Sequence, residues 1–158
     1  MRLKKVVLPI IFFILLFSAC SKNSDSNPES SNQEAKETKK KDDILYGVKD
    51  ESLYKSDVTY DDLARTPDKY SETYLILEGT IHQVIETDDE TQYILLIDNN
   101  PENIMFAHFI KNNPNYPKER LLEGDSVKFK AGSLGLTDYE TVASGIKTVP
   151  NISIHKII

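Results

Sequence analysis

The sequence lacks several features, and each absence excludes a class of protein. A single cysteine among 158 residues leaves no disulfide within the chain. The longest apolar run, residues 6–17, is shorter than the roughly 20 residues that a membrane-spanning helix needs. Basic residues are scarce after residue 43, where eleven Lys and Arg face nineteen Asp and Glu, a net charge of −8. Such an acidic region is a poor generic polyanion binder.

The first nineteen residues have the three parts of an export signal. Basic residues at positions 2, 4 and 5 precede the apolar run 6–17, and Ser18 and Ala19 follow it. The charges hold the orientation of the signal, the apolar run enters lipid, and the small residues fit a peptidase cleft. We predict a signal peptide over residues 1–19.

The end of this signal resembles the lipobox of bacterial lipoproteins, whose usual form is Leu-(Ala/Ser)-(Gly/Ala)-Cys. Phe17-Ser18-Ala19-Cys20 matches three of these positions and departs at Phe17. The resemblance implies that Cys20 becomes the mature N-terminus and carries a palmitate-type diacylglyceryl anchor on the outer face of the cell membrane. Two acyl chains give stable anchoring where one is marginal. The alternatives are an uncleaved signal anchor and a secreted protein with a free thiol.

Residues 21–43 are almost entirely polar, with Ala35 as their one apolar side chain. A segment of this composition has too little apolar surface to bury. We therefore predict that the lipidated Cys20 is followed by a disordered tether to residue 43, with a root-mean-square span of about 25–30 Å. Residues 44–58 show no clear period, and we predict an irregular lead-in.

The remaining residues, 59–158, predict one helix and five strands. Thr59 and Asp62 have the spacing of a capping box, which predicts a helix over Tyr60–Arg65 that ends before a turn at 67–69. Period-two alternation predicts strands over 74–86, 91–98, 104–110 and 149–157, and a fourth strand fed by a turn within 121–130. We expect a bulge or a sharp coil at Val84–Ile85 in the first strand, and a loop or loose hairpin over 132–145.

Five short strands without βαβ alternation favour an all-β fold, a small five-stranded OB-fold-like barrel with one short N-terminal helix. Residues 60–70, 77–86 and 123–127 resemble the extracellular OB-fold domains of low-GC Gram-positive bacteria. The C-terminal domain of the clostridial membrane-anchored toxin regulator is similar. The resemblance covers roughly residues 59–158. It implies a barrel, because the residues that match are of the kinds that pack the core and form turns.

Metal binding is not predicted. His82, His108 and His155 lie on different predicted strands, without the paired spacing of a zinc site. We expect these histidines to face solvent. Asp98 and Glu102 alternate like part of a calcium loop, but the glycine that such a loop requires is missing.

Catalysis is not predicted either, and no cofactor is expected. The sequence has no Gly-x-Ser-x-Gly nucleophile motif. Calcium-dependent nucleases of the same barrel class clamp phosphate with two arginines, whereas this domain has only Arg65 in the predicted helix and Arg120 in a loop. No matched acid pair identifies an enzyme acting on wall polymer. We predict that the domain is not an enzyme.

Binding is therefore the predicted role. OB barrels bind ligands on the face of strands two and three. If positions 93, 95 and 97 point inward, the outward face is apolar and aromatic, and we predict a ligand-binding set of Ile94, Leu96, Phe106, His108 and Tyr139. The lead-in or the loop that carries Tyr116 could instead cover this face, and Tyr139 could be a packing cap.

The predicted partners are the membrane, through the lipid anchor, and an unidentified envelope protein, peptide or glycan. The alternative is a single-stranded nucleic acid, which would need a basic groove with stacking aromatic side chains. Lys128, Lys130 and Lys147 could form a local basic cluster. The acidic turn 88–90 and the net charge of −8 oppose this alternative, and nucleic acid is not the expected partner.

Overall fold

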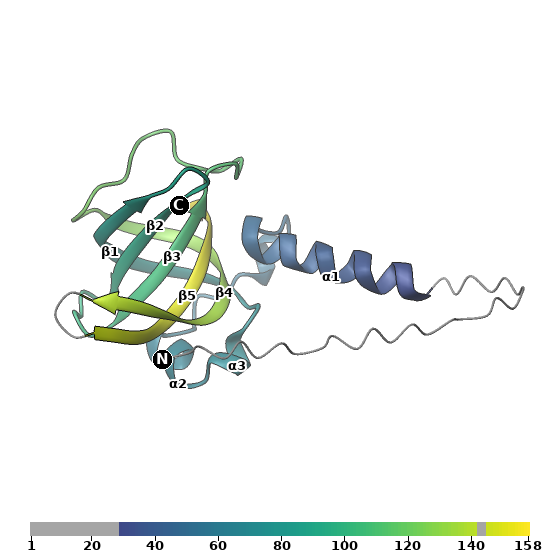
Figure 1. Cartoon of the computed structure of the whole chain (residues 1–158), viewed down its shortest axis with the longest axis horizontal. Coiled ribbons are helices and arrows are strands. Elements are labelled where there is room, and N and C mark those ends of the chain that lie inside the picture. Colours follow the sequence, from purple (N-terminus) through teal and green to yellow (C-terminus); the bar gives the residue numbers. More distant parts are fainter. Residues whose placement is uncertain (1–28, 142–144) are drawn as a thin grey trace, which may run out of the picture.

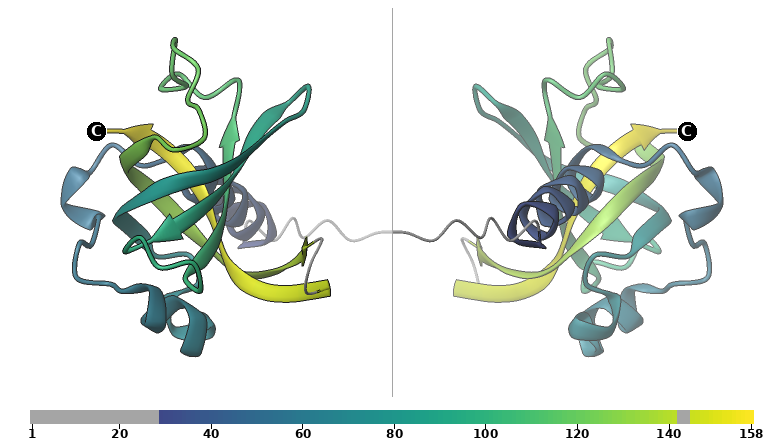
Figure 2. Two further views of the ribbon diagram at one scale, coloured as in Figure 1. Left: turned by 90° about the vertical axis from the view of Figure 1, so that its left-hand side faces the viewer. Right: turned by 90° about the vertical axis from the view of Figure 1, so that its right-hand side faces the viewer.

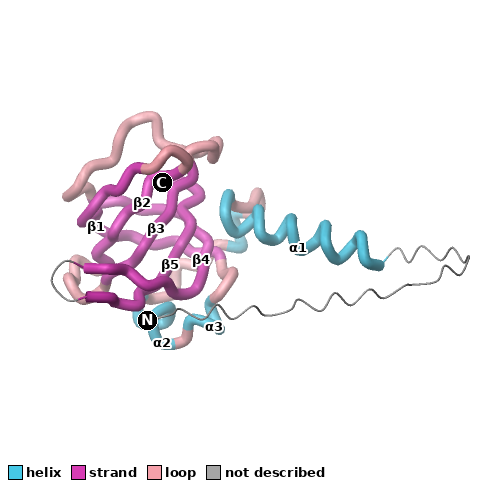
Figure 3. The backbone as a smooth tube through the Cα atoms, viewed as in Figure 1, coloured by secondary structure: helices cyan, strands magenta, loops and turns pink. Residues whose placement is uncertain are grey.

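A computed structural model describes residues 29–141 and 145–158 (Figures 1 and 3). The predicted signal peptide, Cys20 and the first part of the predicted tether lie outside the described residues. The elements are α1 (Glu29–Tyr46), the 3₁₀ turn η1 (Glu51–Leu53), α2 (Tyr60–Arg65), α3 (Pro67–Tyr70), β1 (Tyr74–Glu86), β2 (Glu90–Ile97), β3 (Ile104–Ile110), β4 (Ser126–Thr141) and β5 (Gly145–Ile157).

The five strands close into a barrel in the order β1-β2-β3-β5-β4. All neighbouring pairs are antiparallel except β3 and β5, which run parallel over three residue pairs. The predicted five-stranded OB-fold-like barrel is confirmed. Closure pairs the strand edges with one another and so removes the free edges of an open sheet.

The first strand follows its prediction in extent but not in detail. β1 pairs with β4 up to Thr80 and with β2 from Gly79 onward, so it bends from one neighbour to the other. The register shift lies between Ile81 and Gln83, and the prediction of a bulge at Val84–Ile85 is wrong. At the bend, a Cβ added to Gly79 would lie 2.9 Å from the Ile97 side chain and 3.1 Å from the Leu96 carbonyl oxygen, so a larger residue would be crowded there.

The fourth and fifth strands are longer than predicted. Residues 132–145 were expected to form a loop or loose hairpin, but the ladder between β4 and β5 continues to the pair Thr141 and Gly145. β1 pairs with β4 only up to Gly132, and β3 pairs with β5 only from Asn151 onward. Residues 136–141 and 145–150 therefore extend beyond the barrel as a two-stranded ribbon, the β4–β5 arm (Figure 2).

The ends of the barrel are closed by different segments (Figure 1). On the side of α2, Val58 and the fully buried Leu63 join the core cluster. The predicted capping box of α2 is confirmed, with the Thr59 hydroxyl accepting from the Asp62 backbone N–H. Residues 67–70 form the short helix α3, where we predicted a turn. Across the other end lies loop 111–125, whose Tyr116 ring packs 5.0 Å from Phe109.

The prediction of a disordered tether is wrong for residues 29–43, because α1 covers them. The helix is polar up to Asp43, and intrinsic propensity alone gives such a helix little stability in water. Its last turn, however, packs on β4 and β5, where Ile44 is buried and Lys40 forms an exposed ion pair with Glu72. Within the described residues, no helix is long and apolar enough to cross a membrane.

Barrel side chains complete the C-terminus of α1, whose last four carbonyls lack partners within the helix. Three of these carbonyls accept from side chains of the domain, and the fourth accepts from the N–H of Gly47 in the left-handed region. The pairs are His155 Nε2 with Ile44 O at 2.8 Å, Ser153 Oγ with Leu45 O at 2.7 Å, Asn113 Nδ2 with Tyr46 O at 3.4 Å, and Gly47 N with Asp43 O at 2.9 Å.

His155 is buried beneath this helix end, and the expectation of a solvent-facing side chain is wrong for it. Its Nε2 donates to a carbonyl, so in the neutral ring Nδ1 accepts from the Tyr54 hydroxyl at 2.8 Å. Burial lowers the pKa of His155, although the hydrogen bond to Ile44 opposes this shift. The rings of Tyr54 and Tyr74 pack beside it, and the Lys130 ammonium lies over Tyr54.

We expect the free energy of unfolding to fall as the pH drops below about 6.5, the pKa of histidine in an unfolded chain. The unfolded chain then binds a proton that buried His155 does not, which costs at most about 1.4 kcal/mol per pH unit. Urea unfolding between pH 7.5 and 5.5 measures the slope. His155→Gln should flatten it, whereas His82→Gln, at an exposed position, should not. Equal slopes for wild type and His155→Gln would contradict this assignment.

Candidate functional site

The outer face of β2 and β3 carries most of the predicted ligand-binding set. Three cross-strand pairs project from it, and they are Gln92 with His108, Ile94 with Phe106, and Leu96 with Ile104. The inward positions 93, 95 and 97 belong to the core cluster, so the predicted parity is confirmed. Leu96, Phe106 and His108 are half-buried, whereas Ile94 is fully buried.

The β4–β5 arm brings Tyr139 to this face. The Tyr139 ring lies 6.3 Å from that of Phe106, and its hydroxyl donates to Gln83 Oε1 at 3.2 Å. The Phe106 ring also packs against His108 at 4.9 Å. Tyr139 is thus the packing cap that the sequence left open, and it remains half-buried. Phe106, His108 and Tyr139 form one cluster, which we call the aromatic cluster.

Neither the lead-in nor the loop that carries Tyr116, the two covers that the sequence suggested, lies on this face. Tyr116 instead closes one barrel end, where its hydroxyl is 2.6 Å from Thr91 Oγ1. The lead-in packs on the other side, with Tyr54 against His155. Ile94 lies beneath the surface and is not free to touch a ligand, because its exposed fraction is 0%. The accessible part of the predicted set is therefore Leu96 and the aromatic cluster.

One end of the face is polar. Glu90 accepts from Gln92 Nε2 at 2.6 Å, and His108 Nδ1 lies 3.0 Å from Glu90 Oε1. Burial would raise the pKa of Glu90, but the hydrogen bonds from Gln92 and His108 lower it below its usual value. Glu90 is therefore ionised at neutral pH and holds the His108 ring against Phe106. This end adds a fixed negative charge to the aromatic cluster.

Asn151 was missed by the sequence analysis. It is the β3-facing partner of Phe106 in the parallel pairing of β5. Its Oδ1 is buried and has no hydrogen-bond partner among the described residues. A buried polar atom without a partner costs roughly 1–3 kcal/mol. Because this oxygen is buried, a ligand does not reach it in this arrangement. A lone asparagine in a strand gave no signal in the sequence.

The other residues considered in the sequence do not gather at this face. His82 is exposed on β1, and within residues 29–141 and 145–158 no three His, Cys, Asp or Glu side chains are placed to hold a metal ion. Arg65 pairs with Asp61 and Arg120 with Glu86. These two arginines lie on separate elements, and each is paired with a neighbouring carboxylate.

The three lysines of the nucleic-acid alternative do not form one groove. Lys130 is paired with Glu51 of the lead-in. Lys147 is on the β4–β5 arm, with its ammonium 3.9 Å from Glu102. Lys128 is exposed on β4. Two of the three positive charges are thus opposed by local carboxylates, and the aromatic cluster has Glu90 beside it.

A comparison with family models matches residues 1–137 to the tRNA_anti-like family, an OB-fold family. The matched residues contain β1, β2 and β3 and most of β4, and they end before β5. No curated protein and no solved structure matches the chain.

Proposed function

We propose that this chain, which belongs to the tRNA_anti-like family of OB-fold domains, is a lipid-anchored, non-catalytic binding module on the outer face of the cell membrane. Its barrel binds a segment of an envelope protein or an extracellular peptide. The observation that carries the proposal is the aromatic cluster on the strand face.

The chemistry of this face suits a polypeptide ligand. Aromatic side chains supply contact area at little cost in conformational entropy, and they are frequent energetic centres of protein interfaces. Glu90 at the polar end favours a ligand without negative charge there. A glycan is the other ligand considered for this face, and the experiment below distinguishes it from a peptide.

Presentation at the membrane surface is supported by the order of the segments. The lipobox-like Cys20 precedes α1, an 18-residue helix that is about 27 Å long. Because barrel side chains cap the C-terminal end of α1, the barrel has a fixed orientation relative to this end of the helix. The helix is therefore a spacer between the anchor and the binding face.

Single-stranded nucleic acid is the second candidate, because bases stack on aromatic side chains of OB folds. The observation in its favour is the pair Phe106 and Tyr139, whose rings are 6.3 Å apart. The separated, largely paired lysines oppose it. A gel shift with a single-stranded oligonucleotide at low salt tests it, and a salt-sensitive shift would replace the peptide proposal.

The test of the proposed function uses the full chain in membranes. The probes are an array of peptides from envelope proteins and a glycan array. We expect peptides to bind, and Phe106→Ala to weaken binding by about thirtyfold, as for a residue worth about 2 kcal/mol at an interface.

Leu53→Ala is the control, because Leu53 is exposed on η1, away from the face. Circular dichroism confirms that both variants are folded. Glycan binding without peptide binding, or unchanged peptide affinity in folded Phe106→Ala, would overturn the proposal. Ile94 is unsuited to this test, since a polar residue at its buried position would unfold the barrel.

A further inference from the structure

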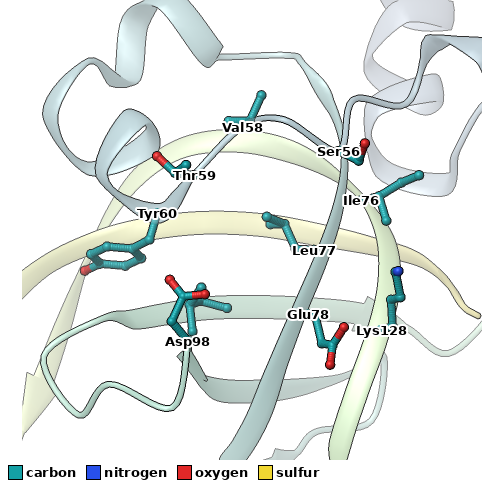
Figure 4. Close-up of a pocket in the computed structure, with 10 residues that line it drawn as sticks. Ser56, Val58, Thr59, Tyr60, Ile76, Leu77, Glu78, Asp98 and Lys128 are labelled. Atoms are coloured by element: carbon teal, nitrogen blue, oxygen red, sulfur yellow. The ribbon is translucent and has the colours of Figure 1, made fainter.

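A pocket lies on another side of the barrel from the strand face, between the lead-in and the place where β1 and β2 diverge (Figure 4). Its volume is about 320 Å³, which is at the small end of the range for ligand pockets. The floor is apolar, because Val58, Leu77 and Ile97 belong to the barrel core and are at most 7% exposed. A ligand of this pocket is therefore small or is a single side chain.

The rim of the pocket carries three charged side chains. Glu78 on β1, Asp98 after β2 and Lys128 on β4 line it. Among the described residues, their side chains make no hydrogen bond and no ion pair. Glu78 and Lys128 are directly opposite in the β1–β4 ladder, so their charges offset one another. Asp98 remains as the uncompensated charge.

The positions of these groups define the shape of a ligand. Figure 4 shows Asp98 and Lys128 on opposite sides of Leu77, with the Tyr60 ring near Asp98. A positive group beside Asp98 would bring the charge of the pocket to zero. The apolar body attached to that group would lie along Leu77 and Val58. An anion of the same shape would meet a surplus negative charge.

We propose that this pocket binds a primary ammonium group on a short aliphatic stem, with the ammonium beside Asp98 and the stem on the apolar floor. Free alkylamines and lysine side chains share this chemistry. The site is separate from the strand face of β2 and β3, so it does not depend on the function proposed for that face.

The test measures binding of three probes with one stem to the full chain in detergent, by titration calorimetry. The probes are n-pentylamine, 1-pentanol and pentanoate. We expect saturable binding of pentylamine and at least about tenfold weaker binding of the other two, since the loss of a charged contact reduces affinity by about this factor. Equal binding of pentylamine and pentanol would overturn the proposal.

Two variants locate the site. Asp98→Asn should weaken pentylamine binding by about tenfold, and asparagine tolerates the left-handed backbone of position 98, where φ is 57°. Asp89→Asn makes the same change of net charge in the exposed turn before β2 and should leave the affinity unchanged. Equal losses in both variants would show non-specific attraction to the acidic domain and would overturn the site.

A fourth probe identifies the source of the ammonium group. Nα-acetyl-lysine methylamide carries the same head and stem on a peptide unit. Binding as tight as that of pentylamine supports capture of a lysine side chain from a polypeptide. Binding of pentylamine alone supports a free amine. Absence of saturable binding by either amine would overturn the proposal.

Discussion

Cys20→Ser releases the protein from membranes into the medium or the soluble fraction, and this is the largest effect that we expect. The proposed diacylglyceryl group would attach to the thiol of the lipobox-like segment, and serine offers no thiol. Each buried methylene contributes about 0.8 kcal/mol, so two acyl chains hold a protein that one would bind only marginally. Fractionation after a high-salt wash, with incorporation of labelled palmitate, measures the loss.

Ser21→Ala is the control, because it alters the neighbouring position and leaves the thiol in place. It should remain in membranes and keep the label. Retention of Cys20→Ser in the washed membranes would instead support an uncleaved signal anchor. Release of both the wild type and Cys20→Ser would support a secreted protein with a free thiol.

Gly132→Ala should undock α1 and lower the free energy of unfolding by about 2–3 kcal/mol. An added Cβ would lie 2.3 Å from the Ile44 carbonyl oxygen and 2.7 Å from its Cδ1. A backbone oxygen cannot turn aside as a side chain can, so the helix end must move away from His155 and Ser153. Overpacking usually costs 1–3 kcal/mol, and the lost hydrogen bonds add to this cost.

Urea unfolding measures the stability of Gly132→Ala, and hydrogen exchange of the amides near residue 47 reports the undocking. Gly124→Ala is the matched control, because nothing lies within 4 Å of its added Cβ. It carries only the strain of a left-handed backbone, about 1 kcal/mol. Equal losses in the two variants, with unchanged exchange near residue 47, would contradict the docking role of Gly132.

The strands with a clean alternation were predictable. β3 was predicted with its observed bounds, and β2 was predicted within one residue at each end. Their side chains alternate between core and outer face, so burial reinforces the local pattern. The capping box of α2 depends on two residues three apart, and it was equally visible in the sequence. In each case the evidence lies within a few neighbouring residues.

The β4–β5 arm and the helix α1 were not predictable, because the contacts that stabilise them join residues far apart in the sequence. Residues 132–141 of β4 contain two glycines and several polar residues, and they form a strand because β5 pairs with them. Residues 29–43 have the composition of a disordered segment, yet the helix end meets His155 and Ser153, more than 100 positions away in the chain. Pairing across such separations leaves no periodic signal in either segment.

The candidate sites likewise had parts that were predictable from single strands and parts that depend on contacts between distant segments. Local composition identified the strand face with Phe106 and His108, because outward parity follows from the alternation of a single strand. The burial of Ile94, the placement of Tyr139 and the exposed partnerless Asp98 depend on how distant strands and the lead-in pack. The sequence alone therefore determined secondary structure and the direction of side chains within single strands. Contacts between distant segments decided which residues cover the strand face and which line the pocket.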